Sequence, residues 1–119
     1  MQLKITKRTV DGILAFECSG RIVFGEESSL LREEVKKAVQ DGIKRIVLNL
    51  GEVTYIDSGG LGTLVALHTT AHNAGATIKL ANLTKRVGDL LQVTKLLTVF
   101  DVRNSEYDAL ESFRKEAAA

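Results

Sequence analysis

The sequence predicts a mixed α/β fold in which strands and helices alternate after an opening hairpin. Apolar and polar residues alternate near the start of the chain, and segments with helical periodicity then alternate with short apolar runs. Such alternation is typical of a sheet with parallel crossover connections. We therefore expect a small mixed β-sheet opened by an N-terminal hairpin, with helices packed mainly on one face.

The length and composition of the chain indicate a folded domain without a strong overall charge. Its 119 residues are 45% hydrophobic and 26% charged, which is typical of a globular protein, and we expect a single domain over residues 1–119. Sixteen basic and fifteen acidic side chains leave a formal net charge of +1. This charge creates no field to attract nucleic acid or an anionic membrane, so direct nucleic-acid binding is not expected. Any partner must therefore be recognised by a particular group of surface residues rather than by the overall charge.

The first predicted elements are a β-hairpin and a long helix. Residues Leu3 to Val10 and Ile13 to Ser19 have a period of two, and Asp11-Gly12 between them suits a type I′ turn. The stretch Glu26 to Gln40 then places apolar residues on one helical stripe, with acidic residues early and Gly42 beyond its end. We expect an amphipathic helix of about four turns there. Its predicted stripe consists of Leu30, Leu31, Val35, Ala38 and Val39.

A nearly continuous apolar run from Ile43 to Leu50 predicts a strand that is buried on both faces, and therefore the centre of the sheet. Helical spacing returns after Tyr55-Ile56, and Gly75 is a suitable C-terminal stop. We therefore expect a second helix that starts near Ser58.

The C-terminal third is expected to add two strands and two helices. We expect a strand over Ala76 to Ala81, followed by a short helix that Thr84 caps and that ends at Val93. A last strand with its lead-in is expected over Leu96 to Val102. Ser105 should introduce a final helix that Leu110 and Phe113 hold, and Ala117 to Ala119 should be frayed.

Cysteine usage and hydropathy bear on the location of the protein. The single Cys18 cannot form an internal disulfide, and with only Arg21 as a positive neighbour it is expected to be a structural thiol. The first ten residues do not build an apolar signal segment. The longest nearly apolar stretch, Gly59 to Leu67, is about half of the roughly 20 residues that a membrane span needs. We expect a cytoplasmic protein without a membrane span.

The segment Asp57-Ser58-Gly59-Gly60-Leu61-Gly62 carries the candidate site. Ser58 lies where a strand turns into a helix, and we expect it to be the N-cap. A phosphate there would be favoured by the helix dipole by roughly 0.3 to 1 kcal/mol. Gly59 and Gly60 leave the hydroxyl accessible to another protein, and Asp57 could orient that hydroxyl or tie the loop. The alternative is that Ser58 is only a cap and that the glycines only permit a tight turn.

Other chemistries lack the residues that they need. A phosphate-binding loop requires Gly-Lys-Ser/Thr, and the dinucleotide motif requires a third glycine where Val65 stands. His68 and His72 have no carboxylate or cysteine at metal-site spacing. His68 is about 15 Å along the same helix from Ser58, too far to act as its base. We expect no enzyme, no catalytic residue, no metal and no cofactor.

Three segments resemble the STAS domain of the anti-sigma factor antagonist family: IVLNL (46–50), YIDSGGLG (55–62) and NLTKRV (82–87). The resemblance implies a switch in transcription regulation by partner exchange. The unphosphorylated domain would bind an anti-sigma factor, often itself a serine kinase, and free the sigma factor. Ser58 matches the phosphoacceptor serine of the family, and a serine phosphatase would act on phosphorylated Ser58. The resemblance also implies that residues Asp57 to Gly62 bind the partner.

The chain departs from the family pattern at two positions. Gly59 replaces a second hydroxyl residue that many members carry, and Val23 stands where members that bind anti-sigma kinases often have an acidic residue. Glu26 and Glu27 follow closely and could substitute. The alternative function is a phosphorylation-independent STAS adaptor or scaffold subunit, for example of a lipid-transport complex, in which Ser58 serves as cap and contact.

Overall fold

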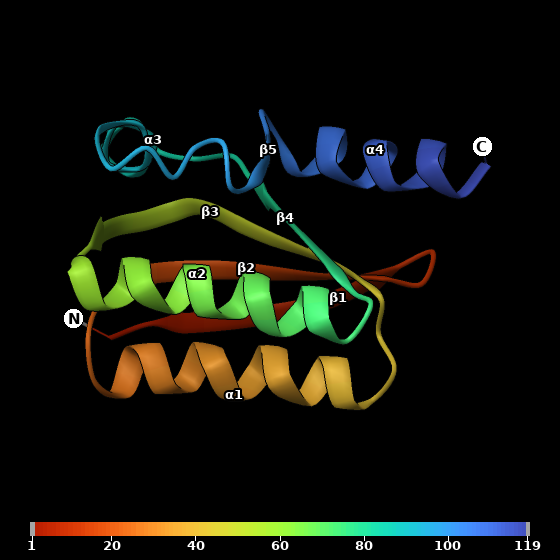
Figure 1. Ribbon diagram of the computed structural model, residues 1–119, viewed down its shortest axis with the longest axis horizontal. Helices are drawn as coiled ribbons and strands as arrows, with labels where there is room; N and C mark the ends of the chain where they lie inside the picture. Colours follow the sequence, from red (N-terminus) through yellow and green to blue (C-terminus); the bar gives the residue numbers. More distant parts are fainter. Residues whose placement is uncertain (1, 119) are drawn as a thin grey trace.

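The computed structural model describes residues 2–118, which form one mixed five-stranded sheet with four helices (Figure 1). The elements in chain order are β1 (Lys4–Val10), β2 (Ile13–Ile22), α1 (Glu26–Gln40), β3 (Arg45–Ile56), α2 (Ser58–Asn73), β4 (Thr77–Ala81), α3 (Lys85–Val93), β5 (Asp101–Arg103) and α4 (Glu106–Ala118). The strands lie in the order β1-β2-β3-β4-β5. The first pair is antiparallel and the other pairs are parallel, so the predicted mixed fold with its N-terminal hairpin is confirmed.

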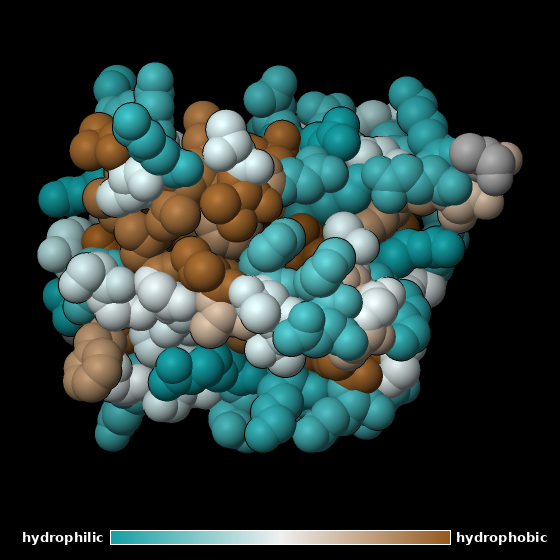
Figure 2. Space-filling model, viewed as in Figure 1, coloured by the Kyte–Doolittle hydropathy of each residue, from teal (hydrophilic) through white to brown (hydrophobic). Residues whose placement is uncertain are grey.

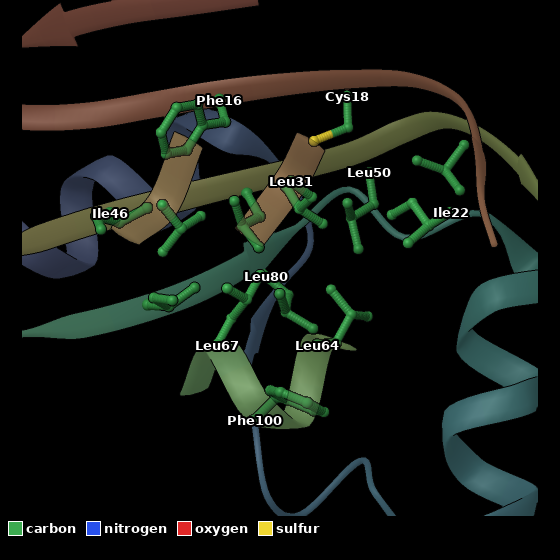
Figure 3. Packing of buried hydrophobic residues seen from close by; sticks show 14 of the residues in the cluster. Phe16, Cys18, Ile22, Leu31, Ile46, Leu50, Leu64, Leu67, Leu80 and Phe100 are labelled. Atoms are coloured by element: carbon green, nitrogen blue, oxygen red, sulfur yellow. The ribbon is translucent and has the colours of Figure 1, made fainter. Parts of the chain in front are cut away.

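The sheet separates two hydrophobic clusters. Helices α1 and α2 cover one face, and α4 lies on the other (Figure 1). Figure 3 shows the larger cluster, where Leu64 and Leu67 of α2 point toward Leu80 of the sheet. Phe16 of β2 belongs to the same cluster. The smaller cluster lies under α4 around Phe113. Strand β3 contributes to both clusters, which confirms it as the buried centre of the sheet.

Strands β2 and β3 run farther than the sequence analysis predicted. They end at Ile22 and Ile56, rather than at Ser19 and Leu50, because their pairing continues through two register irregularities and joins Ile22 to Ile56. Bulges of this kind let a ladder continue past residues that do not fit a regular strand. The longer strands carry the loop after β2 to the point where α2 begins.

Strand β5 is shorter than predicted, because residues before Asp101 form turns instead. The amide of Leu96 donates to the carbonyl of Leu91, and the amide of Val99 donates to the carbonyl of Leu96. Only Asp101–Arg103 then pairs with β4.

Two helices differ from expectation in detail. Helix α1 has the predicted bounds, but Leu30 is 41% exposed and does not belong to its buried stripe. Helix α4 continues through Ala117 to Ala118, so the predicted fraying of these two residues is wrong. The remaining residue of that prediction, Ala119, lies outside the described residues.

Candidate partner-binding site

Asp57, rather than Ser58, caps α2. Asp57 has an extended backbone, and its carboxylate accepts a hydrogen bond of 2.7 Å from the amide of Gly60. Ser58 is the first residue of the helix, and its side chain is exposed. The prediction that Ser58 is the N-cap is therefore wrong, because the carboxylate one position earlier reaches the free amide of the first turn.

Asp57 also ties α2 to the loop that follows β2. The amide of Phe24 donates to both carboxylate oxygens, at 3.1 Å each. Hydrogen bonds from the amides of Gly60 and Phe24 favour the charged carboxylate and lower the pKa of Asp57 below its usual value of 3.8. Of the two roles predicted for Asp57, the structure shows the tying of the loop.

The glycines of the segment permit close packing of this loop. A Cβ on Gly60 would overlap the carbonyl oxygen of Ile22, and a Cβ on Gly59 would lie 2.6 Å from the Cβ of Phe24. Neither position accepts a larger residue without a shift of its neighbours. The glycines therefore have a packing role besides leaving the hydroxyl accessible.

The six predicted site residues differ in how far they face the solvent. Ser58 and Gly62 are exposed, and Asp57 and Gly59 are half-buried. Gly60 and Leu61 are buried, and Leu61 belongs to the larger hydrophobic cluster. Ser58 and Gly62 thus lie at the surface of this segment, and Gly60 and Leu61 lie in its interior.

Phe24 is part of this surface, and the sequence analysis missed it. Phe24 is 83% exposed, whereas Val23 is buried and its carbonyl accepts hydrogen bonds from the amide and hydroxyl of Ser28. The loop therefore turns Val23 inward and Phe24 outward. Periodicity gave no signal here, because Gly25 follows with a φ of 109° and breaks any regular pattern.

A second apolar surface lies beside the same junction. A groove of about 390 Å³ is lined by Tyr55, Leu90, Val93 and Arg86, among others, and the guanidinium of Arg86 lies 5.2 Å from the centre of the Tyr55 ring. Apolar residues gather on this face of the molecule, in the area where Figure 1 places α3 and the segment leading to β5 (Figure 2). The groove adjoins the candidate site, since Tyr55 comes two residues before Asp57.

The histidines and the cysteine considered in the sequence analysis pack against neighbouring residues or lie in the core. His68 is half-buried, with its ring centre 5.7 Å from that of Phe100 and 6.4 Å from that of the exposed His72. Cys18 is fully buried, which confirms a structural thiol, and burial raises its pKa to about 12.

The described part of the chain contains neither a metal-ligand cluster nor a helix that could cross a membrane. Within residues 2–118, no group of three or more His, Cys, Asp or Glu side chains could hold a metal ion. No helix in the same range has the length and apolar character that crossing a membrane requires.

Comparisons with known proteins identify the family. The STAS domain model matches residues 4–109. The chain is 28% identical over 112 residues to BtrV of Bordetella bronchiseptica, a candidate anti-sigma factor antagonist, with 94% of this chain and 96% of BtrV covered. Other curated relatives are anti-sigma factor antagonists of sigma F and sigma B systems.

Solved structures share the fold. A candidate anti-sigma factor antagonist from Thermotoga maritima superposes with a TM-score of 0.85 at 22% identity, covering 92% of this chain and 94% of that protein. The anti-sigma factor antagonist SpoIIAA of Bacillus, known in unphosphorylated and phosphorylated forms, gives a TM-score of 0.73 for the unphosphorylated form at 15% identity, with 93% and 98% covered. Proteins of this family act by binding rather than by catalysis, which confirms the prediction that the chain is not an enzyme. The match over residues 4–109 places the chain in the STAS domain family.

Proposed function

We propose that the protein is an anti-sigma factor antagonist whose binding is switched off by phosphorylation of Ser58. In its unphosphorylated form it binds an anti-sigma factor through the surface around Ser58 and so frees a sigma factor. The observation that carries the proposal is the exposed position of Ser58 in the first turn of α2, at a place that the family resemblance marks as the phosphoacceptor.

The start of α2 can accept a phosphate without losing its cap. Asp57 satisfies the amide of Gly60, so the Ser58 hydroxyl is not needed for capping. A phosphate on Ser58 would add about two negative charges near the positive end of the helix dipole, where anions are favoured. The fold would therefore survive modification, and the change would act on the partner.

The proposal includes two enzymes that act on the same side chain. An anti-sigma factor with serine kinase activity would phosphorylate Ser58, and a serine phosphatase would restore it. The phosphorylated form of SpoIIAA supports such a cycle in a protein of the same fold. A cytoplasmic location, where sigma factors act, is part of the proposal.

Two substitutions at Ser58 test the switch. Ser58→Asp adds a negative charge in the first turn of α2, so the fold should keep its stability to within about 1 kcal/mol. A carboxylate that is buried against a partner surface without a group to pair with it should weaken binding by roughly 2 to 5 kcal/mol, which is about thirty-fold or more. Ser58→Ala should keep both the fold and the affinity, and the cognate kinase should no longer modify it.

The partner for this test is obtained by pull-down with the wild-type chain from its native cells, followed by purification. Thermal unfolding and isothermal titration calorimetry then measure stability and affinity. Near-wild-type affinity of a folded Ser58→Asp protein would contradict the switch. Phosphate incorporated into Ser58→Ala would contradict the assignment of the acceptor.

The phosphorylation-independent adaptor remains the second candidate in the test. It predicts recovery of a transporter ATPase or another complex subunit instead of an ATP-binding anti-sigma factor, and unchanged affinity of Ser58→Asp.

A further inference from the structure

Phe24 is the most exposed large hydrophobic residue within residues 2–118. The residue is 83% exposed, compared with 79% for Val93 and 68% for Tyr107. Exposure alone does not indicate a binding role, because single apolar side chains are common on protein surfaces. What distinguishes Phe24 is that its backbone is held firmly while most of the residue is exposed and only one edge of the ring lies beside Gly59.

Contacts from two sides fix the backbone of Phe24. Its amide donates to both carboxylate oxygens of Asp57 at 3.1 Å, and it packs so closely on Gly59 that a Cβ there would lie 3.0 Å from the Phe24 Cα. The preceding residue, Val23, is buried, and its carbonyl accepts the hydroxyl of Ser28 at 2.6 Å. The aromatic ring therefore projects from a backbone held at the starts of α1 and α2.

Such an arrangement is preorganised for binding. An aromatic side chain offers a large contact area with few rotatable bonds, and a fixed backbone reduces the entropy lost on association. Aromatic residues that enter a partner pocket often provide a large share of the binding energy. Ser58 follows Asp57 directly, so a phosphate on its hydroxyl would lie next to the residue that holds Phe24.

We propose that Phe24 is the aromatic anchor of the partner interface and that Asp57 is its positioning residue. In the complex, the ring of Phe24 enters an apolar pocket of the anti-sigma factor, so this inference rests on the proposed function. A phosphate on Ser58 then faces the rim of an apolar pocket, where a charge is poorly solvated. The anchor and the switch thus belong to one surface.

Truncation of the anchor tests the first half of the proposal. Phe24→Ala should weaken binding of the purified anti-sigma factor about thirty-fold or more, as measured by calorimetry. Thermal unfolding should be unchanged, because the ring is exposed and the Cβ that packs on Gly59 remains. Phe24→Leu should keep most of the affinity, since it retains an apolar side chain.

Tyr107 provides a matched control. It is also an exposed aromatic residue, but it belongs to α4, which lies on the other face of the sheet from α2 (Figure 1). Tyr107→Ala should bind within about two-fold of the wild type, because surface substitutions outside an interface have small effects.

A double-mutant cycle tests the role of Asp57. Asp57→Ser keeps a side-chain oxygen that can cap α2, but it removes the two-oxygen acceptor of the Phe24 amide. It should weaken binding about tenfold in the wild-type background and add little in the Phe24→Ala background, because it acts through Phe24. The amide resonance of Phe24 should also shift. An equal loss in both backgrounds would overturn the positioning role.

The Ser58→Asp variant distinguishes a failure of the Phe24 anchor from a failure of the proposed function. If Ser58→Asp weakens binding but Phe24→Ala loses less than tenfold, the anchor is overturned and the proposed function stands. If Ser58→Asp leaves the affinity unchanged, the proposed function fails, and this inference fails with it.

Discussion

Asp57 joins the start of α2 to the loop after β2 through one carboxylate, and this makes its protonation state important. Hydrogen bonds from Gly60 and Phe24 lower the pKa of Asp57 below 3.8. A carboxylate with a depressed pKa in the folded state stabilises the fold above the pKa of the unfolded chain, and the contribution is lost as the pH falls through the folded pKa.

We therefore predict that the pH dependence of stability below about pH 4 includes a contribution from Asp57. Urea unfolding of wild type at pH 7 and at pH 3 should show a loss of stability on acidification. Asp57→Asn, which retains a capping oxygen but no titrating group, should show a smaller loss. Equal losses in both proteins would contradict the role assigned to the carboxylate.

The thiol of Cys18 provides a second prediction for a single residue. Burial, and secondarily the charge of Glu17, raises its pKa to about 12, so very little thiolate forms near neutral pH. The folded protein should therefore react very slowly with an aromatic disulfide reagent at pH 8, whereas the urea-unfolded chain should react at the rate of a free thiol. Fast reaction of the folded protein would show that Cys18 is accessible.

Two glycines of helix α2 differ in what surrounds them, although both belong to the same motif. A Cβ on Gly60 would meet the backbone carbonyl of Ile22, which cannot move aside cheaply, whereas a Cβ on Gly62 would meet nothing within 4 Å. We predict that Gly60→Ala destabilises the protein by about 1 to 3 kcal/mol. Gly62→Ala should stabilise it by about 0.5 to 1 kcal/mol, because alanine favours the helix. Urea unfolding measures both, and similar effects of the two substitutions would contradict the packing role of Gly60.

Helices and their ends could be predicted from the sequence only where the signals are local. Helical periodicity and Thr84 as a cap predicted α3 with its correct end, because these signals are local. The N-cap of α2 was predicted wrongly, since Asp57 and Ser58 are both good caps and the hydrogen bonds of Asp57 to Phe24 join segments that are distant in sequence. Likewise, the orientation of Phe24 depends on contacts between the starts of two helices that are distant in sequence.

Helix α4 is attached through a buried lysine of the neighbouring strand. Lys79 has a 1% exposed side chain, and its ammonium lies 2.5 Å from Glu116 and 3.5 Å from Asp101 and contacts the hydroxyl of Ser112. The same ammonium lies 4.3 Å from the centre of the Phe113 ring. The two carboxylates are partly exposed, so they can return to water if the lysine is removed.

We predict that Lys79→Met changes the stability by no more than about 1 kcal/mol, because a side chain of similar volume replaces a buried charge. Lys79→Ala should cost about 2 to 4 kcal/mol, because it leaves a cavity between the sheet and α4. Thermal or urea unfolding compares the two variants. A large loss in Lys79→Met would mean that the ion pairs, rather than packing, hold α4.

Across the whole molecule, the sheet divides the hydrophobic core unequally. The larger cluster joins the sheet to α1 and α2, whereas α4 covers only a small cluster that includes Ile13, Val47 and Phe113. Apart from Lys79, charged contacts such as Arg114 with Asp11 at 2.9 Å hold α4, and both of these side chains are partly exposed. Exposed ion pairs contribute little to stability.

We therefore predict that α4 opens before the rest of the protein unfolds. Native-state hydrogen exchange at low denaturant concentrations should give opening free energies for α4 amides that are at least about 1 kcal/mol below those of central β3 amides. Helix α2, which packs on the larger cluster around Leu64 and Leu67, is the internal control and should exchange with the sheet. Because Ser58, Asp57 and Phe24 lie on the side of the molecule that stays folded, opening of α4 should leave partner binding intact. Exchange of α4 only through global unfolding would show that the small cluster and Lys79 hold it as firmly as the main core holds α2.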